Sequence, residues 1–203
     1  MNEENVLTWR DYYVTLLILF ANIIGFILCT QMGEVVYNVG SMNAEKILAD
    51  GQYYRLLSSM FLHADIGHIV SNMIFLAGLG QMIEHAIGHA GFAVLYLLSG
   101  LGAGICSMFY SVITGELYNS VGASGAVFGL IGALFILVVV HNGTFGSVSI
   151  GRLVFAVAYM IYTGANSESV DNAAHVGGLV CGILIMAVMN VIMVFRKPYH
   201  VQK

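Results

Sequence analysis

Two polar residues, Ser124 and His175, stand at the edges of long apolar runs in this sequence. Ser124 lies in Gly-Ala-Ser-Gly, where a loop meets an apolar segment, and His175 lies in Ala-Ala-His-Val-Gly-Gly at the head of the last apolar segment. Ionisable groups in or beside hydrocarbon are costly, so they indicate function by default. A serine hydroxyl becomes a good nucleophile when a neighbouring base takes its proton, and histidine suits that role. The pair therefore indicates nucleophilic catalysis, provided that the two side chains meet.

His68 and Asn72 could complete such a site. Their spacing of four residues places them on one face of a helix. Attack on a carbonyl creates an oxyanion, and removing one donor to that oxyanion typically costs about a hundredfold or more in rate. The side chains of His68 and Asn72 are two candidate donors. The backbone N–H of Ser124, which a helix start leaves without an intrahelical partner, is the third.

The composition indicates an integral membrane protein. Of the 203 residues, 59% are hydrophobic and 9% are charged, and the mean hydropathy is +0.85. A soluble domain normally carries about a quarter charged residues. A single proline, 24 glycines and no alternation of polar and apolar residues favour helices over a transmembrane barrel. The net charge of −4 is unclustered, so no nucleic-acid partner is expected.

Six apolar stretches are predicted to cross the bilayer, since a span needs roughly 17–25 residues. The predicted fold is an all-α, six-helix transmembrane bundle that forms a single domain, residues 1–203, with short tails. The fifth stretch is short, so a partial or tilted span is expected there. No small-residue cleavage site follows the first stretch, which argues against a removed signal peptide. The stretches are residues 12–30, 67–83, 91–113, 124–140, 150–163 and 173–195.

An even number of spans puts both termini on one side, and the positive-inside rule makes that side the cytoplasm of a cell membrane. The four candidate site residues then lie at outer helix ends and at similar depth. The cytoplasmic side collects Arg10, Arg152, Arg196, Lys197 and Lys203, against Lys46 and Arg55 outside.

Two further features bear on the fold. Residues 33–66 form a long connection rich in aromatic residues and leucine, so we expect an ordered segment partly in the outer interface. Cys29, Cys106 and Cys181 lie in or at the ends of spans without metal-ligand spacing. We expect them to pack as small apolar residues, and we expect no cofactor.

Small residues recur along two of the predicted spans. Such rows let membrane helices approach until their backbones nearly touch. If the two rows face each other, Ser124 and His175 come within side-chain reach, and Phe128 lies beneath the imidazole. The rows are Gly125, Gly129 and Gly132 on the fourth span, and Ala174, Gly178 and Gly182 on the sixth.

Each site residue also has a purely structural interpretation. A serine at a helix start is usually an N-cap. A histidine at the end of a membrane helix is usually an interfacial or packing residue, and an asparagine can link two helices by a hydrogen bond. These interpretations must explain four polar residues separately, whereas one site explains their common depth.

A series of motifs runs from residue 51 to residue 182 in order. In that order and at these spans, the motifs resemble those of the rhomboid family of intramembrane serine proteases, in its minimal six-helix form. The motifs are Gly-Gln-Tyr-Tyr-Arg-Leu from Gly51, then His63, His-Ile-Val-Ser-Asn from His68 to Asn72, Glu84, Gly-Ala-Ser-Gly from Gly122 to Gly125, and Ala-His-Val-Gly-Gly from Ala174 to Gly178.

The resemblance implies an intramembrane serine endopeptidase with Ser124 as nucleophile and His175 as base and then acid. It implies an oxyanion hole formed by His68, Asn72 and the Ser124 amide. The partners would be transmembrane protein substrates that enter from the lipid bilayer, unwind easily and carry small residues near the cut. The oligomeric state is left open.

The resemblance also assigns supporting roles. The first loop would be half-embedded, with Arg55 and Glu84 helping to hold it against the bundle, and His63 would be structural. The fifth span and the loop at 164–172 would form a mobile gate. The chain departs from the family where Phe128 replaces a frequent tyrosine and where Tyr54 precedes Arg55 in place of tryptophan.

Four alternatives compete with this interpretation. Asp171, one turn before His175, allows a triad in place of a dyad. A catalytically inactive rhomboid-like protein that binds membrane helices would lack the serine or the histidine. A transporter would show ionisable groups in the middle of spans or repeated broken helices. A metalloprotease would need His-Glu-x-x-His, but in Glu84–His89 the glutamate precedes both histidines, so no metal site is predicted.

Overall fold

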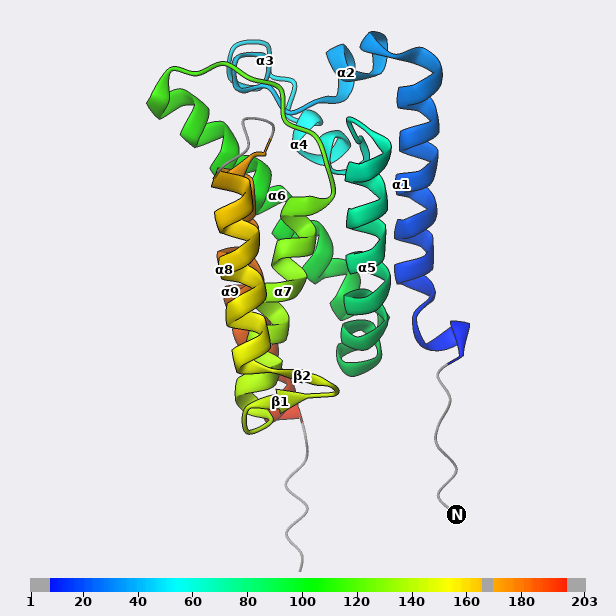
Figure 1. The fold of residues 1–203 in the computed structure, drawn as a ribbon, viewed down its shortest axis with the longest axis vertical. Helices are drawn as coiled ribbons and strands as arrows, with labels where there is room; N and C mark the ends of the chain where they lie inside the picture. The colour runs from blue at the N-terminus through cyan, green and yellow to red at the C-terminus, as the bar shows by residue number, and fades with distance from the viewer. Residues whose placement is uncertain (1–7, 166–169, 197–203) are drawn as a thin grey trace, which may run out of the picture.

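Six apolar helices form a bundle in the computed structural model of this chain, which describes residues 8–165 and 170–196 (Figure 1). Four of them, α1, α5, α6 and α9, are long and apolar enough to cross a membrane, and α7 and α8 are shorter. The predicted all-α class is confirmed, and each predicted span coincides with one helix. The bounds are α1 (Tyr13–Met32), α5 (Ile66–Ile87), α6 (His89–Thr114), α7 (Ser124–Val140), α8 (Ile150–Ala165) and α9 (Asn172–Arg196).

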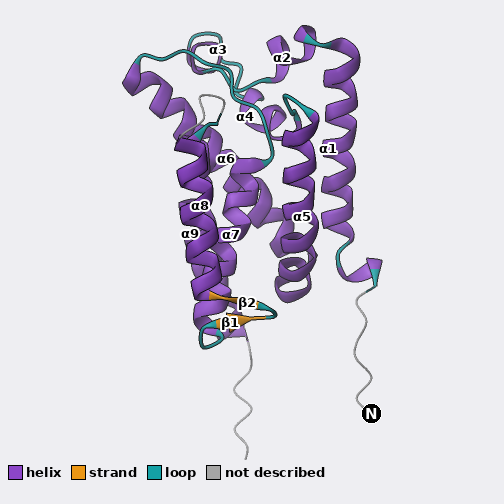
Figure 2. Ribbon diagram, in the orientation of Figure 1, coloured by secondary structure: helices purple, strands orange, loops and turns teal. Residues whose placement is uncertain are grey.

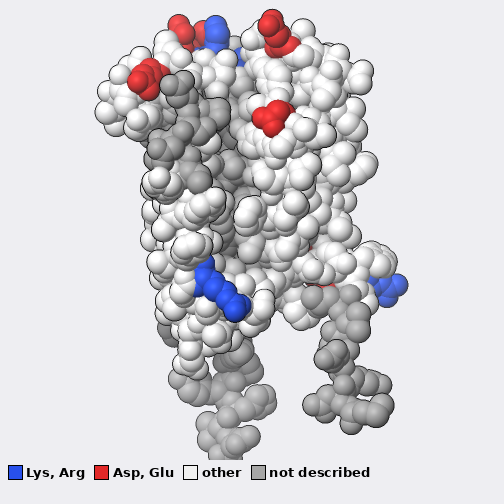
Figure 3. All heavy atoms as spheres, in the orientation of Figure 1, with Lys and Arg blue, Asp and Glu red and all other residues white. Residues whose placement is uncertain are grey.

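The charged side chains gather at the two ends of the bundle. On the face drawn in Figure 3, Asp and Glu side chains lie at the top with Lys or Arg atoms among them, further Lys and Arg side chains lie toward the bottom, and a broad band between the two ends is almost free of charge. We call the end that carries the short helices between α1 and α5 the upper end, and the opposite end the lower end (Figure 1). An uncharged band bounded by charged ends suits a protein that crosses a bilayer.

Helix α7 lies in the centre of the bundle, in contact with α5, α6, α8 and α9. Its sequence has no polar face, and every residue from Gly125 to Leu134 is buried. Its 17 residues rise only about 25 Å, which is less than the roughly 30 Å hydrocarbon core of a bilayer. The loop before it therefore descends into the bundle, as Figure 1 shows, and Ser124 begins the helix below the upper end.

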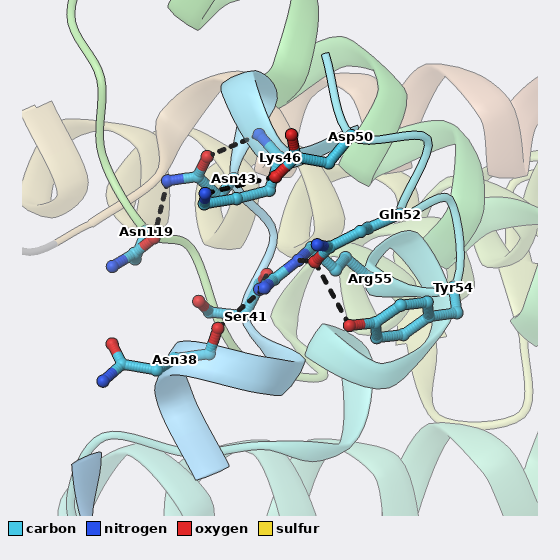
Figure 4. A network of polar contacts seen from close by, with 9 residues as sticks. All are labelled: Asn38, Ser41, Asn43, Lys46, Asp50, Gln52, Tyr54, Arg55 and Asn119. Carbon is cyan, nitrogen blue, oxygen red and sulfur yellow. Dashed lines mark hydrogen bonds and ion pairs between the residues drawn. The ribbon is translucent and has the colours of Figure 1, made fainter. Parts of the chain in front are cut away.

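The connection between α1 and α5 is built from short helices around a buried arginine. Arg55 donates from Nε to Gln52 Oε1 at 2.7 Å, from Nη1 to the Ser41 carbonyl at 2.9 Å and from Nη2 to the Asn38 carbonyl at 2.7 Å (Figure 4). Two of these acceptors are carbonyls at the end of α2, so the guanidinium joins α2 to α4. The short helices are α2 (Glu34–Gly40), α3 (Ala44–Leu48), α4 (Arg55–Ser58) and a 3-10 helix (Ser59–Phe61).

This connection also holds the loop that precedes α7. Met42 and Ser120 exchange backbone hydrogen bonds of 2.9 and 3.0 Å. Asn43 Nδ2 donates to Asn119 Oδ1 at 2.9 Å (Figure 4). Residues 115–123 are therefore attached to the first loop at two adjacent points. The long connection predicted to be ordered thus supports the approach to Ser124.

Glu84 does not hold the first loop, contrary to the role that the family resemblance had implied. It lies at the lower end of α5, far along the helix from that loop, and its carboxylate is fully buried. The carboxylate accepts hydrogen bonds from the amides of Val14 and Thr15, at 2.9 and 2.7 Å, and from Thr15 Oγ1 at 2.7 Å. His89 Nδ1 lies 2.6 Å from it. Glu84 therefore caps the start of α1 from a neighbouring helix, because first-turn amides lack intrahelical partners.

A small hairpin joins α7 to α8 at the lower end. Strands β1 (Thr144–Phe145) and β2 (Val148–Ser149) pair antiparallel, and Figure 2 shows them as the only strands in the part of the chain that the structure describes. Gly146, with φ of +56°, begins the two-residue turn between them, which suits the twist of a hairpin. The hairpin occupies the connection between the fourth and fifth predicted spans.

The two rows of small residues face each other across α7 and α9, as predicted. A Cβ atom on Gly178 would overlap the Gly125 carbonyl oxygen, and one on Gly182 would overlap the Gly129 carbonyl oxygen. A Cβ atom on Gly132 would overlap the Leu179 carbonyl oxygen. Only hydrogen at these positions allows backbones to approach so closely. This contact sets how near the upper ends of α7 and α9 lie to each other.

Candidate active site

Ser124 and His175 meet at the upper ends of α7 and α9. Ser124 Oγ lies 2.9 Å from His175 Nε2. Ser124 is the first residue of its helix, and Ala123 occupies the N-cap position without a side-chain hydrogen bond, so the N-cap interpretation of Ser124 is wrong. A serine hydroxyl that donates to Nε2 leaves the proton of a neutral ring on Nδ1. Among the described residues, Nδ1 of His175 has no hydrogen-bond partner.

Phe128 fixes the plane of the histidine ring. The Phe128 and His175 rings stack with 4.2 Å between their centroids and 12° between their planes. Phe128 is only 1% exposed and follows Ser124 by four residues, so one turn of α7 presents both side chains to His175. Because the phenyl ring is buried, its rotation is restricted, and the stacked imidazole is held in the same plane.

His68 lies beside the peptide that precedes Ser124. A Cβ atom on Gly122 would lie 2.7 Å from His68 Nε2, and Gly122 has a φ of +130°, so both the space and the backbone require glycine here. Asp65 caps α5 by accepting from the His68 amide at 2.9 Å. Asn72, one turn further along, is 5% exposed, and its Nδ2 donor has no partner in the described part of the chain. Buried donors of this kind are costly unless they serve a ligand.

His63 contacts the same peptide. Its side chain is fully buried, and its Nε2 accepts a hydrogen bond from the Ala123 amide at 3.4 Å. The Tyr37 hydroxyl donates to the His63 carbonyl at 2.7 Å, and the Gly122 amide donates to the Ser59 carbonyl at 2.9 Å. Burial lowers the pKa of His63 to about 4, so the imidazole is neutral near pH 7 and can accept from an amide.

Among the described residues, Asp171 makes no hydrogen bond to the imidazole of His175, although it lies one turn before it. Its Oδ1 accepts from the Ala174 amide at 2.9 Å, and its Oδ2 accepts from the Ser107 hydroxyl. Both carboxylate oxygens are thus occupied by other donors, which argues against the triad alternative. Ser107 was not among the predicted site residues, because its only signal in the sequence is a small polar side chain within an apolar span.

A small cavity of about 20 Å³ lies beside Ser124. Gly100, Ala103 and Gly104 of α6 form part of its wall, together with Met42 of the first loop. These small residues leave space next to the serine, but the side chains around them keep it narrow. A methyl-sized group fits such a space better than a long side chain.

The predicted gate is described only in part. Residues 166–169 of the loop at 164–172 lie outside the described residues. The helix α8 presents Phe155, which is 73% exposed and stacks on Tyr159 with 6.4 Å between ring centroids. The part of the gate that the structure describes therefore carries an aromatic face.

Cys29, Cys106 and Cys181 are free thiols, and the last two lie beside glycines. Cys181 Sγ occupies the space beside Gly102, and Cys106 Sγ lies 2.7 Å from the Cβ position of Gly177. Within residues 8–165 and 170–196, no three His, Cys, Asp or Glu side chains gather where they could hold a metal ion.

The sequence is similar to a known protein family and to several of its members. Residues 50–191 match the family described as Rhomboid domain. The chain is 29% identical over 163 residues to the rhomboid protease GluP of Bacillus subtilis, and 34% identical over 149 and 155 residues to the RHOMBOID-like proteins 4 and 2 of Arabidopsis thaliana. The matches cover 75%, 72% and 75% of this chain but only 31%, 36% and 47% of those proteins. The matched part of the chain therefore spans less than half of the length of each of these relatives. The family match covers more than half of the sequence and includes every residue of the site described above except Tyr37 and Met42, so the chain belongs to the rhomboid family.

Proposed function

We propose that this chain is an intramembrane serine endopeptidase, with Ser124 as nucleophile and His175 as general base and then general acid. The observation that carries the proposal is the contact of 2.9 Å between Ser124 Oγ and His175 Nε2. A base within hydrogen-bond reach of a serine is the geometry that nucleophilic catalysis needs. The stack of His175 on Phe128 supports the proposal, because it holds the base in one plane.

Acylation would begin when Ser124 Oγ attacks the carbonyl carbon of the scissile peptide and its proton passes to His175 Nε2. The carbonyl oxygen becomes an oxyanion, which the side chains of His68 and Asn72 and the Ser124 amide would stabilise. The C–N bond then breaks, and Nε2 returns the proton to the leaving amine. The unpartnered Nδ2 of Asn72 supports its assignment as a donor.

Deacylation would repeat these steps with water. His175 takes a proton from the water as it attacks the acyl carbon, and the bond from that carbon to Ser124 Oγ breaks as the proton returns to the serine. The occupied carboxylate of Asp171 supports a dyad, because no third side chain in the described residues bonds to His175 Nδ1.

The substrates we propose are transmembrane protein segments that enter from the lipid. Ser124 begins its helix below the upper end of the bundle, which supports cleavage within or close to the membrane. The cavity of about 20 Å³ beside the serine favours a small residue at the cut. The lysine and arginine pattern supports a cell membrane protein with cytoplasmic termini and an active site toward the outer face.

The test is cleavage of a transmembrane substrate in proteoliposomes by the wild type, Ser124→Ala and His175→Ala, with a serine-reactive phosphonate probe in parallel. Ser71→Ala and His85→Ala are the matched controls, because the Ser71 hydroxyl bonds to the His68 carbonyl and to no other group in the described part of the chain, and because His85 lies at the lower end of α5. We expect the controls to cleave and to label, and the two site variants to do neither.

Two outcomes oppose the proposal. If Ser124→Ala cleaves or labels as well as the wild type, another residue is the nucleophile. If the folded wild type neither cleaves nor labels but still binds a membrane helix, the chain is an inactive helix-binding member of the family.

A further inference from the structure

Asp171 and Ser107 connect the helix of the proposed base to a neighbouring helix. Asp171 precedes α9 and caps it through Oδ1, which accepts from the Ala174 amide at 2.9 Å. Its second oxygen accepts from Ser107 Oγ, and the Ser107 side chain on α6 is fully buried. His175 follows Asp171 by four residues, and its amide donates to the Asp171 carbonyl at 3.1 Å. A shift of Asp171 would therefore move the first turn of α9 and His175 with it.

Ser107 also contacts the loop that leads to Ser124, the proposed nucleophile. The Tyr118 hydroxyl lies 3.2 Å from Ser107 Oγ and 3.3 Å from the Ser107 carbonyl. An ionised carboxylate only accepts, so the Ser107 proton points to Asp171 and the Ser107 oxygen is left to accept from Tyr118. Burial raises the pKa of the Tyr118 hydroxyl, which keeps it a donor. The Tyr118 proton is shared between the hydroxyl and carbonyl oxygens of Ser107, and the Ser107 proton goes to Asp171, so the hydrogen bonds run from Tyr118 through Ser107 to Asp171. Hydrogen bonds linked in this way reinforce one another.

Further contacts connect Tyr118 and Ser107 to the start of α7 at Ser124. Beyond Tyr118, Ser120 pairs with the backbone of Met42, and the Gly122 amide bonds to the Ser59 carbonyl. On α6, Ala103 lies one turn before Ser107 and packs against Gly125. One face of α6 therefore contacts the start of α7 at Ala103 and the start of α9 at Ser107.

We infer that Tyr118, Ser107 and Asp171 form a positioning network that sets the distance between Ser124 and His175. The network does so by joining the loop before α7 to the cap of α9. This inference rests on the function proposed above. None of the three residues would touch the reacting atoms. Their effect would be on how often Ser124 Oγ and His175 Nε2 adopt the reactive geometry, and thus on kcat more than on KM.

The experiment measures kcat, KM, probe labelling and thermal unfolding for Ser107→Ala, Tyr118→Phe, Asp171→Ala and Asp171→Asn. Ser111→Ala is the matched control, since Ser111 is also a buried serine of α6 and also bonds the following loop, at the Glu116 carbonyl, 2.5 Å away. Ser111 has no contact with Asp171 among the hydrogen bonds of the described residues. Both serine variants lose one buried hydroxyl, so their difference reports the network.

We expect Ser107→Ala to lower kcat by about tenfold to a hundredfold with KM nearly unchanged, because a displacement of about 1 Å can cost a hundredfold in rate. Tyr118→Phe should lower kcat by less, and adding it to Ser107→Ala should cost little more. Asp171→Asn keeps an oxygen for the Ala174 amide and a polar group for Ser107, so it should recover most of the kcat that Asp171→Ala loses. Ser111→Ala should leave kcat unchanged.

Two results overturn the inference while the wild type remains active. If Ser107→Ala and Ser111→Ala have the same kcat, the network does not position the site. If Asp171→Asn is as inactive as Ser124→Ala, the carboxylate takes part in the chemistry itself. An inactive wild type would instead remove the proposed function, together with the inference that rests on it.

Discussion

The imidazole of His175 lies parallel to the phenyl ring of Phe128, with 4.2 Å between the ring centroids and 12° between the planes. One turn of α7 presents this ring and the Ser124 hydroxyl to the same histidine. The stack therefore controls the orientation of the ring, while the hydrogen bond of 2.9 Å controls its distance from the serine.

Replacing Phe128 by leucine should slow the reaction. Aromatic pairs contribute about 0.5–1.5 kcal/mol beyond their buried area, and loss of that orientation should lower kcat by about twofold to tenfold. Phe128→Tyr keeps the ring and should retain more activity than Phe128→Leu. Steady-state cleavage of a transmembrane substrate gives both values, and equal kcat for the two variants would mean that the stack has no role in orienting His175.

A methyl group on Gly178 should separate α7 from α9. Because the added Cβ would overlap the Gly125 carbonyl oxygen, Gly178→Ala should destabilise the fold by about 1–3 kcal/mol and should lower kcat by drawing His175 away from Ser124. Gly78→Ala is the control, since its Cβ would meet nothing within 4 Å. Thermal unfolding in detergent and cleavage assays measure the two effects. A Gly178→Ala variant that matches Gly78→Ala in both would contradict this close approach.

His63 should make the fold sensitive to acid. Burial lowers its pKa in the folded protein to about 4, below the ordinary value of 6.5 that it has in an unfolded chain. Between these values the unfolded chain binds more protons, so the stability is fully present above about pH 6.5 and falls as the pH drops toward 4. His63→Gln, which keeps an acceptor for the Ala123 amide, should lose less stability over this range. Identical midpoints of unfolding across pH 4–7 for both proteins would rule out this contribution.

Removing the Glu84 carboxylate should loosen the start of α1. Glu84→Ala leaves the amides of Val14 and Thr15 without the partners that they have in the structure. Each unsatisfied buried group costs about 1–3 kcal/mol, so the free energy of unfolding should fall by about 3 kcal/mol. The exposed Glu45 provides a control in Glu45→Ala. Hydrogen exchange at Val14 and Thr15 should speed up in Glu84→Ala, and unchanged exchange would show that Glu84 does not cap α1.

The proposed protease should prefer substrates that unwind easily. A regular helix encloses its carbonyl groups in hydrogen bonds, so a helix-breaking residue in the middle of a substrate segment should raise kcat/KM. Paired model segments with and without a central glycine pair, in the same lipid, would measure this. Equal cleavage of the two would mean that unwinding is not limiting.

Much of the fold could be predicted from composition and periodicity. The six spans follow from runs of apolar residues, because hydrocarbon demands continuous helices. The start of α7 at Ser124 follows from the change from loop to apolar residues, and the facing of α7 and α9 follows from their glycine rows. The short helices α2, α3 and α4 could be predicted only as an ordered segment, because the bonds that join α2 to α4 run from Arg55 to the Ser41 and Asn38 carbonyls, 14 and 17 residues away in the sequence.

The sequence by itself determined the class of this protein and the residues that could perform its chemistry. Ser124, His175, His68 and Asn72 are recognisable because polar groups are rare and costly in an apolar chain. Only the tertiary structure decided what these and other polar groups bind. It directs Asp171 to Ser107 and away from the imidazole, and it brings Glu84 to α1 and away from the first loop. The physical reason is that hydrophobicity depends on each residue and its neighbours in sequence, whereas a hydrogen bond between two helices depends on how the whole bundle packs.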